Sequence, residues 1–189
     1  MTAAQEIVDM GDRELIACAQ QGDRQAFGEL VRRHQSSLVS MLYHFCGDPD
    51  LAEDAAQEAF VRVWQNLKSY KPEHAFRSWL YRIAANAALD SLRRERPGLD
   101  LNSLPRLASQ SADPQQEVEA NQRAQQVRQA IGRLSPGLRL VLVLREYQEL
   151  SYREMAEALE LPIGTVMSRL NSARSQLRQE LQVLLEEEA

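Results

Sequence analysis

Apolar residues recur at steps of three and four along most of this chain, with charged and polar residues between them. This spacing places the apolar side chains on one face of a helix, whereas a half-buried strand would alternate at every second residue. Leu, Ala, Gln, Glu and Arg, which favour helices, dominate the same segments. No alternating stretch of useful length occurs in the sequence. The pattern therefore predicts an all-α protein.

Cap residues divide the first half of the chain into separate helices. Asp12, Asp23 and Asp48 are each expected to cap a helix, because an Asp carboxylate accepts hydrogen bonds from the unpaired amides of a first turn. Pro49 suits the first helical position after Asp48. After a short loop, a further helix is expected over Phe76 to Arg94.

The apolar pattern is interrupted between Pro97 and Ser111, where Pro, Gly, Ser, Asn and Asp accumulate. Such a composition is typical of a linker. The chain has 189 residues, which is enough for two small domains. We therefore expect two helical domains, over residues 11–97 and 114–185, joined by a flexible linker over residues 98–113.

A helix-turn-helix is predicted between Ser151 and Arg174. Ser151 and Glu154 have the spacing of a capping box, in which each side chain accepts from the other residue's amide. Pro162 cannot continue the first helix, so the segment from Glu160 to Pro162 is expected to form the turn. The expected inward-facing residues are Met155, Ala156, Leu159, Val166, Leu170, Ala173 and Leu177.

The outer face of the second of these helices carries small or hydrogen-bonding side chains, where a merely solvated face would carry more charge. Such side chains can contact base edges in the major groove, and a Gly at a helix N-terminus lets the backbone approach a phosphate. Arg169 and Arg174 flank this face and are assigned to phosphate contacts or packing. The alternative is an ordinary antiparallel helix pair. The candidate DNA-binding residues are Gly164, Thr165, Met167, Ser168, Arg169, Asn171, Ser172 and Arg174.

The formal net charge of −5 is unusual for a protein that binds DNA on its own, because phosphate contacts dominate affinity. The charges are segregated. Residues 46–60 contain acids and no Lys or Arg, whereas residues 76–97 are rich in Arg. This segregation indicates one surface for a basic partner and another for nucleic acid, with weak DNA binding by the chain alone.

Other function classes find little support in the sequence. No glycine-rich phosphate loop or nucleophile constellation occurs, and the three His residues are not at metal-ligand spacing, so we expect neither an enzyme nor a metal or cofactor site. Cys18 and Cys46 are expected to be inert thiols. No run of about 20 apolar residues and no basic leader is present, so a cytoplasmic protein without membrane insertion is expected.

Three motifs in order resemble bacterial sigma factors of the extracytoplasmic-function (group IV) type of the sigma-70 family. They are Asp54 to Phe60, Phe76 to Asn86 and Leu161 to Leu170. The resemblance covers nearly the whole chain, and this type retains only sigma domain 2 and sigma domain 4. It implies a subunit that binds core RNA polymerase and directs it to promoters. Domain 2 would open the −10 element, and domain 4 would read the −35 element.

The resemblance also implies roles for individual residues. Asp54, Gln57 and Glu58 share one helix face, which in the family binds the β′ clamp helices of polymerase; the β subunit is a further expected partner. A calcium loop is not expected here, because the required Gly is missing after Asp50. The implied −10 DNA-binding residues are Tyr70, Lys71, His74, Arg77, Arg82 and Asn86, with Phe76 and Trp79 as core support.

The recognition helix departs from the family pattern at Met167, Asn171 and Ser172, where many members carry basic or aromatic residues. Fewer charged contacts to the −35 element are therefore expected. The family also implies an anti-sigma factor that blocks polymerase binding and can recruit the chain to the inner membrane. A free-standing dimeric regulator with the same helix-turn-helix is the alternative hypothesis; it would bind its operator tightly without polymerase.

Overall fold

The computed structural model describes residues 7–73, 75–95 and 118–187, and all regular secondary structure within them is helical. This confirms the all-α prediction. The expected linker over residues 98–113, and the start of the second expected domain at residue 114, lie outside the described residues.

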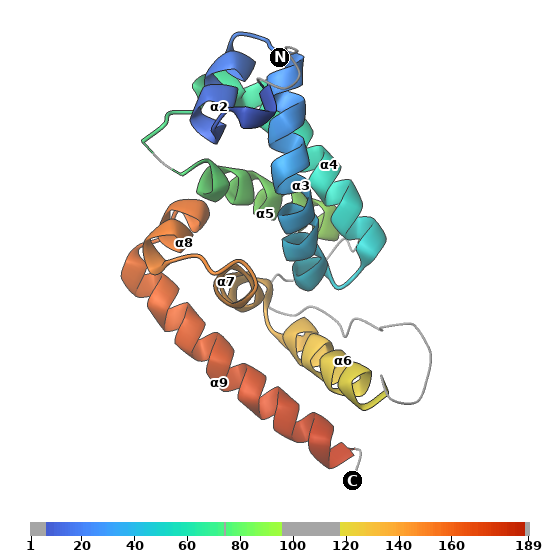
Figure 1. Ribbon diagram of the computed structural model, residues 1–189. Coiled ribbons are helices and arrows are strands. Elements are labelled where there is room, and N and C mark those ends of the chain that lie inside the picture. The colour runs from blue at the N-terminus through green and yellow to red at the C-terminus, as the bar shows by residue number, and fades with distance from the viewer. Residues whose placement is uncertain (1–6, 74, 96–117, 188–189) are drawn as a thin grey trace.

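The first unit of the fold runs from α2 to α5, at the top of Figure 1. Asp23 caps α3 by accepting from the amides of Gln25 and Ala26, and Asp48 caps α4 by accepting from the Leu51 amide. Both caps were predicted. The elements are α2 (Asp12–Gln20), α3 (Arg24–Cys46), α4 (Pro49–Asn66), the 3-10 turn η1 (Leu67–Ser69) and α5 (Phe76–Glu95).

The predicted cap at Asp12 is wrong. Gly11 is the N-cap residue of α2, and its amide donates to the Glu14 carboxylate at 2.8 Å. Asp12 is the first helical residue, and its carboxylate instead lies 3.1 Å from Nη1 of Arg33 and 2.7 Å from Nε2 of His34. Asp12 therefore anchors α2 on α3, a contact that the local sequence does not reveal.

The second unit runs from α6 to α9, in the lower part of Figure 1. Its central helix, α7, is buried along Leu140 to Leu144 and lies between α3 and α9. An ion pair of 3.2 Å between Arg133 and Glu180 joins α6 to the distal part of α9. The elements are α6 (Val118–Arg133), α7 (Pro136–Glu146), α8 (Tyr152–Leu159) and α9 (Ile163–Glu187).

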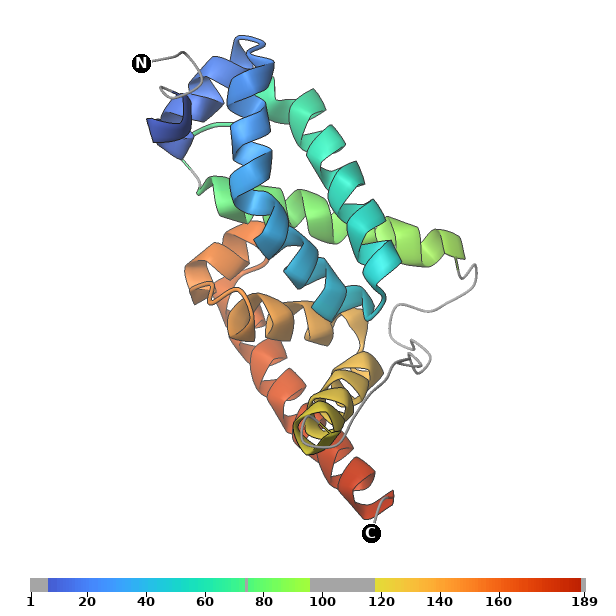
Figure 2. The ribbon, with the colours of Figure 1, turned by 45° about the vertical axis from the view of Figure 1, so that its right-hand side comes forward.

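The two units are in contact in the structure. α8 lies beside α5, and α7 lies against α3, as the two views in Figures 1 and 2 agree. Buried apolar residues of both units form one continuous cluster. Among the described residues, no helix is long and apolar enough to cross a membrane.

Candidate nucleic-acid and protein interfaces

The predicted helix-turn-helix is formed by α8 and α9. The Ser151 amide donates to Oε2 of Glu154 at 2.8 Å, and the Glu154 amide donates to Oγ of Ser151 at 3.3 Å, so the capping box is present. The hydrogen bond from the Ser151 hydroxyl is the main reason why the pKa of Glu154 is lowered. Glu160 ends α8 in the left-handed conformation with φ of 52°. The chain then turns at Leu161 and Pro162 before α9 begins.

Packing within this motif follows most of the predicted stripe, but Ala156, Leu159 and Leu177 are only half-buried. Met155, Val166 and Leu170 are buried, as expected. Ala156 is only half-buried, and the fully buried small residue of α8 is Ala158, which faces a cavity shared with α5. The difference arises because α8 packs on both α9 and α5, so two of its faces are covered rather than one.

The outer face of α9 is open to solvent. Gly164, Met167, Ser168, Asn171 and Ser172 are all exposed, and Thr165 is half-buried. A Cβ added to Gly164 would meet no atom within 4 Å, so nothing in the fold itself requires Gly there. The first amides of a helix have no partner within it, and α9 presents them beside this residue. The face can therefore accept a phosphate at its start and base edges along its length.

The two arginines that flank this face have different surroundings. Arg174 lies 2.8 Å from the Glu146 carboxylate at the end of α7, and this contact raises the pKa of Arg174. Arg169 is exposed, and its guanidinium lies close to Gly137 at the start of α7. Arg169 also lines a cavity of about 190 Å³ together with Arg82 of α5.

The loop between η1 and α5 is built around aromatic contacts. Tyr70 is buried, with its ring centroid 4.9 Å from that of Trp79 and 5.8 Å from that of Phe76. This burial raises the pKa of the Tyr70 phenol. Lys71 is exposed, and His74 lies outside the described residues. Phe76 and Trp79 thus pack beneath the loop as expected, and Tyr70 is packed with them.

Two residues of α2 that sequence reasoning missed also meet this loop. Nε2 of Gln20 donates to the carbonyls of Leu67 at 2.9 Å and Tyr70 at 3.1 Å, which fixes the start of the loop. Arg13 and Gln20 line a cavity of about 340 Å³ with Tyr70. These contacts join residues about fifty positions apart, so no local pattern marks them.

The predicted −10 residues on α5 face the second unit. Nη2 of Arg77 donates to the backbone carbonyl of Gln148, and the Tyr81 hydroxyl donates to Oε1 of Gln148 at 2.6 Å. Arg82 forms an ion pair with Glu160, the C-cap residue of α8. Asn86, one turn further along α5, is exposed at the rim of the cavity that Arg82 and Arg169 share.

The predicted polymerase-binding residues lie on α4. Asp54 and Gln57 are exposed. Glu58 is partly exposed, and its carboxylate lies 2.8 Å from Nε of Arg62, which also contacts Asp90 of α5 at 3.1 Å. Part of the acidic face is therefore neutralised within the unit.

A groove of about 730 Å³ runs between α3 and α4 beside Gln57. Val39, Phe60 and Val61 supply apolar lining, and half of the Val61 side chain (51%) is exposed. Arg32 and Glu53 add charged groups. The periodicity of the sequence indicated the acidic face but did not show this groove, because two helices must pack together to form it.

The comparisons with known proteins fit both units. The family model for sigma-70 region 2 matches residues 30–97, and the model for sigma-70 region 4 matches residues 124–177. The RNA polymerase sigma-H factor of Pseudomonas aeruginosa is 34% identical to this chain, over 93% of the chain and 96% of that protein. The ECF RNA polymerase sigma factor SigW of Bacillus subtilis is 30% identical, over 94% of the chain and 100% of that protein.

Solved structures share the fold of this chain. The structure of CnrH in complex with the cytosolic domain of CnrY matches with a TM-score of 0.69 and 30% identity, over 94% of this chain and 99% of that chain. The sigma factor RpoE in complex with the anti-sigma factor NepR, from Bartonella quintana, has a TM-score of 0.62 and 22% identity over 83% of this chain and 97% of that chain, and shares the fold.

Proposed function

Because this chain belongs to the extracytoplasmic-function sigma factors of the sigma-70 family, we propose that it binds core RNA polymerase and directs transcription initiation at specific promoters. One observation carries this proposal. A single chain combines an open helix-turn-helix face on α9 with a separate acidic and grooved face on α4. A DNA-binding regulator needs only the first of these faces.

The polymerase-binding surface that we propose comprises Asp54, Gln57 and Glu58 together with the groove between α3 and α4. The apolar floor of the groove suits a helix from the partner, which would bury its apolar face there. The acidic rim favours a basic partner and speeds its association. The β′ clamp helices are the proposed partner for this surface, and the β subunit contacts the chain elsewhere.

The DNA-binding surfaces are proposed on α5 with its preceding loop, and on α9. In the first unit, Lys71, Arg77, Arg82 and Asn86 supply cationic and polar groups for an opened −10 strand, and Tyr70 and His74 complete the proposed set. Captured bases need such groups beside aromatic rings. In the second unit, the −35 element is read by the exposed face of α9, from Gly164 to Arg174.

We further propose that an anti-sigma factor holds the chain inactive, because the similar CnrH was solved with a bound partner protein. The chain itself carries out no covalent chemistry in this proposal, and it acts in the cytoplasm. Recruitment to the inner membrane would come from the anti-sigma factor.

Run-off transcription with core enzyme on a library of promoter fragments tests the function. We expect discrete transcripts that depend on both the chain and core enzyme. Core enzyme alone, and core enzyme with Ser172→Glu, serve as controls. If no template yields a transcript that depends on the chain, although the chain is folded by circular dichroism, the proposed function is wrong.

A further inference from the structure

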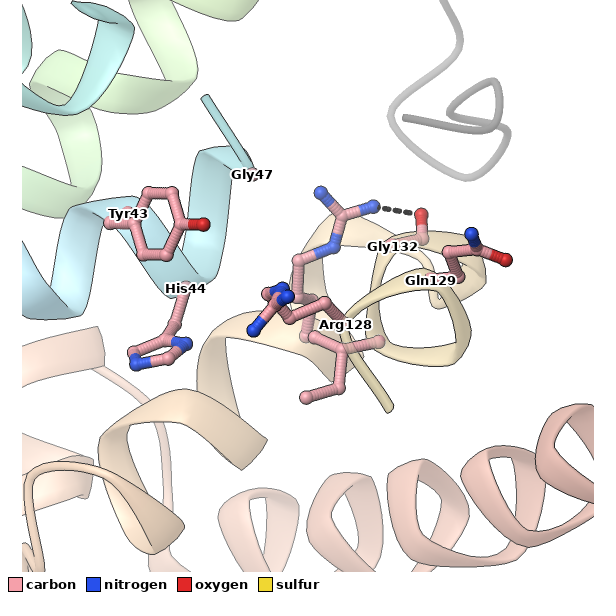
Figure 3. Close-up of a pocket in the computed structure, with 8 residues that line it drawn as sticks. Tyr43, His44, Gly47, Arg128, Gln129 and Gly132 are labelled. Atoms are coloured by element: carbon pink, nitrogen blue, oxygen red, sulfur yellow. Dashed lines mark hydrogen bonds between the residues drawn. The ribbon is translucent and has the colours of Figure 1, made fainter. Parts of the chain in front are cut away.

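A small cavity lies where the end of α3 meets α6 and the first turns of α7. Its volume is about 30 Å³, roughly twice the space that one water molecule needs. Figure 3 shows Tyr43 and His44 of α3 on one side of this cavity and Arg128 and Gln129 of α6 on the other. Arg139 of α7 also contributes to the lining. The residues proposed to bind polymerase or DNA do not line it, so the proposed function leaves this cavity unexplained.

Two guanidinium groups and an imidazole meet at this cavity. Arg139 is 1% exposed, and burial lowers its pKa to about 10, so it stays charged at neutral pH. Arg128 is half-buried, and its charge adds to the larger effect of burial in lowering the pKa of His44, so these two side chains lie close together. No carboxylate lines the cavity in the part of the chain that the structure describes. Two cations therefore face a small space that has no acidic side chain beside it.

Backbone carbonyls hold the Arg139 guanidinium in one orientation without neutralising it. Nη1 donates to the Phe45 carbonyl at 2.9 Å, and Nη2 donates to the carbonyls of Gly132 and Leu134. These carbonyls lie at the ends of α3 and α6, where the helix dipoles offset part of one positive charge. They do not offset the charge of a second guanidinium nearby. The site is therefore rigid on the side of Arg139, and it retains a surplus of positive charge.

Three nitrogen atoms of these side chains have no hydrogen-bond partner among the described residues. They are Nδ1 of His44, Nε of Arg128 and Nε of Arg139, and all three are buried. Buried polar groups in proteins are nearly always paired, so a cluster of three indicates a partner from outside the chain. The N–H groups of an arginine only donate hydrogen bonds. The missing partner must therefore be an acceptor.

The size and the charge of the cavity together limit which acceptor fits. A water molecule accepts hydrogen bonds, but it does not offset the charge of two guanidinium groups. A phosphate offsets this charge, but it carries four oxygen atoms, each about as large as a water molecule, and the cavity has room for about two. A monatomic anion such as chloride meets both conditions. Arg128 and Gln129 are only half-buried, so an anion can enter from the solvent on their side.

We propose that the end of α3 forms, with α6 and α7, a binding site for one small inorganic anion of the size and charge of chloride. Arg128 and Arg139 supply the positive charge and the N–H donors, and His44 donates when its Nδ1 carries the proton. The bound anion joins three helices that meet at this point. The site does not depend on the proposed function in transcription, and it makes the stability of the chain depend on the anion present.

Urea unfolding of the full chain at constant ionic strength tests the site. Sodium chloride replaces sodium gluconate stepwise, because gluconate is too large an anion for the cavity. Above the dissociation constant of chloride, each tenfold rise in chloride should lower the unfolding equilibrium constant by about tenfold, since one anion binds only the folded chain. An unfolding constant that stays the same from chloride-free buffer to about 1 M chloride would overturn the proposal. Water would then be the partner of the three nitrogen atoms.

Two variants separate binding at this site from a general effect of salt. Arg128→Met removes a guanidinium from the cavity and should abolish most of the chloride dependence. His44→Phe keeps a ring where His44 stacks on Tyr147, with centroids 3.6 Å apart, but removes Nδ1, so it should weaken the dependence less. Arg178→Met is the matched control, because Arg178 is an exposed arginine of α9, and it should keep the wild-type dependence. Equal chloride dependence in the wild-type chain and in Arg128→Met would contradict the site.

Bromide locates the anion directly, because it has the charge of chloride and nearly its size, and it scatters X-rays anomalously. Crystals of the full chain grown with sodium bromide should show an anomalous peak in this cavity, between Arg128 and Arg139. The same position in crystals of Arg128→Met should show none. An absent peak in the wild-type chain, or an equal peak in both chains, would refute the proposed site. Failure of run-off transcription would instead count only against the proposed function.

Discussion

The two DNA-facing surfaces of this chain differ in what the fold leaves open. On α9 the face is almost uncharged and exposed, and Ser168 bonds only within its own helix, to the Thr165 carbonyl at 3.0 Å. On α5 the face is cationic, and Arg77 and Arg82 are both engaged by the second unit. A bare cationic face would bind any DNA through its phosphates. The comparison shows that the surface with little charge is left open, whereas the surface most prone to non-specific binding is covered.

Arg139 contributes to both units, so replacing it gives the largest expected effect. Its guanidinium donates to the carbonyls of Phe45, Gly132 and Leu134, and burial lowers its pKa to about 10, so it stays charged at neutral pH. Arg139→Met leaves these carbonyls without their donor and should lower the free energy of unfolding by roughly 2–4 kcal/mol. Urea unfolding followed by circular dichroism measures this free energy of unfolding. The exposed Arg178→Met is the control, and coincident curves for the two variants would refute the expectation.

A charge on the open face should impair the −35 surface alone. Ser172→Glu places a carboxylate on the face that we propose binds DNA, and this carboxylate would repel the DNA phosphates. Transcription from a cognate promoter should fall by roughly tenfold or more, while the melting temperature stays unchanged. Gln179→Glu makes a similar change further along α9. An equal loss in both variants would show that the effect is not local to the recognition face.

Removing two acids from α4 should weaken the interaction with polymerase. Asp54→Ala with Glu58→Ala is expected to reduce the affinity for core enzyme by about tenfold, or about 1.4 kcal/mol. The helical content should stay intact, because Arg62 retains Asp90 as a partner. Titration of labelled chain with core enzyme gives the affinity. Asp50→Ala, in the first turn of α4, is the control, and unchanged binding by the double variant would remove these residues from the interface.

The smallest expected effect concerns the pH dependence of the contact between the two units at the end of α3. Burial, and then the nearby Arg128, lower the pKa of His44, whose ring stacks on Tyr147. The contact between the two units therefore favours neutral His44, and Arg139 and Tyr43 line the same cavity without offering a carboxylate.

The sign of the pH effect follows from this lowered pKa. The contact between the two units should be fully formed above the ordinary His pKa of about 6.5 and weaken as pH falls below it, by a few-fold at most for the one proton bound. Energy transfer between fluorophores attached at the exposed Gln65 of α4 and Gln179 of α9 should decline from pH 7.5 to 5.5 in the wild-type chain and decline less in His44→Gln. An equal or steeper loss in the variant would contradict the role of His44.

Much of the fold is local and could be predicted from the sequence. The caps at Asp23, Asp48 and Ser151, and the turn at Pro162, depend on residues within three or four positions of each other. Asp12 has the same chemistry but was predicted wrongly, because Arg33 and His34 compete for its carboxylate across 21 and 22 residues.

The candidate surfaces were predictable to a different extent. The exposed face of α9 follows from helical periodicity alone. The contacts of the second unit with α5 do not follow from periodicity, because Gln148 lies 67 positions from Tyr81 and Glu160 lies 78 positions from Arg82. Such contacts depend on how the two units pack, and a local pattern of residues does not predict that packing. The groove beside Gln57 has the same origin.

Binding of a promoter fragment by the chain with and without core enzyme tests most directly whether the two surfaces work only together with polymerase. In an electrophoretic mobility shift, we predict no sequence-specific complex for the chain alone and a stable, sequence-specific complex once core enzyme is added. A tight and sequence-specific complex formed by the isolated chain would contradict the claim and favour a free-standing regulator.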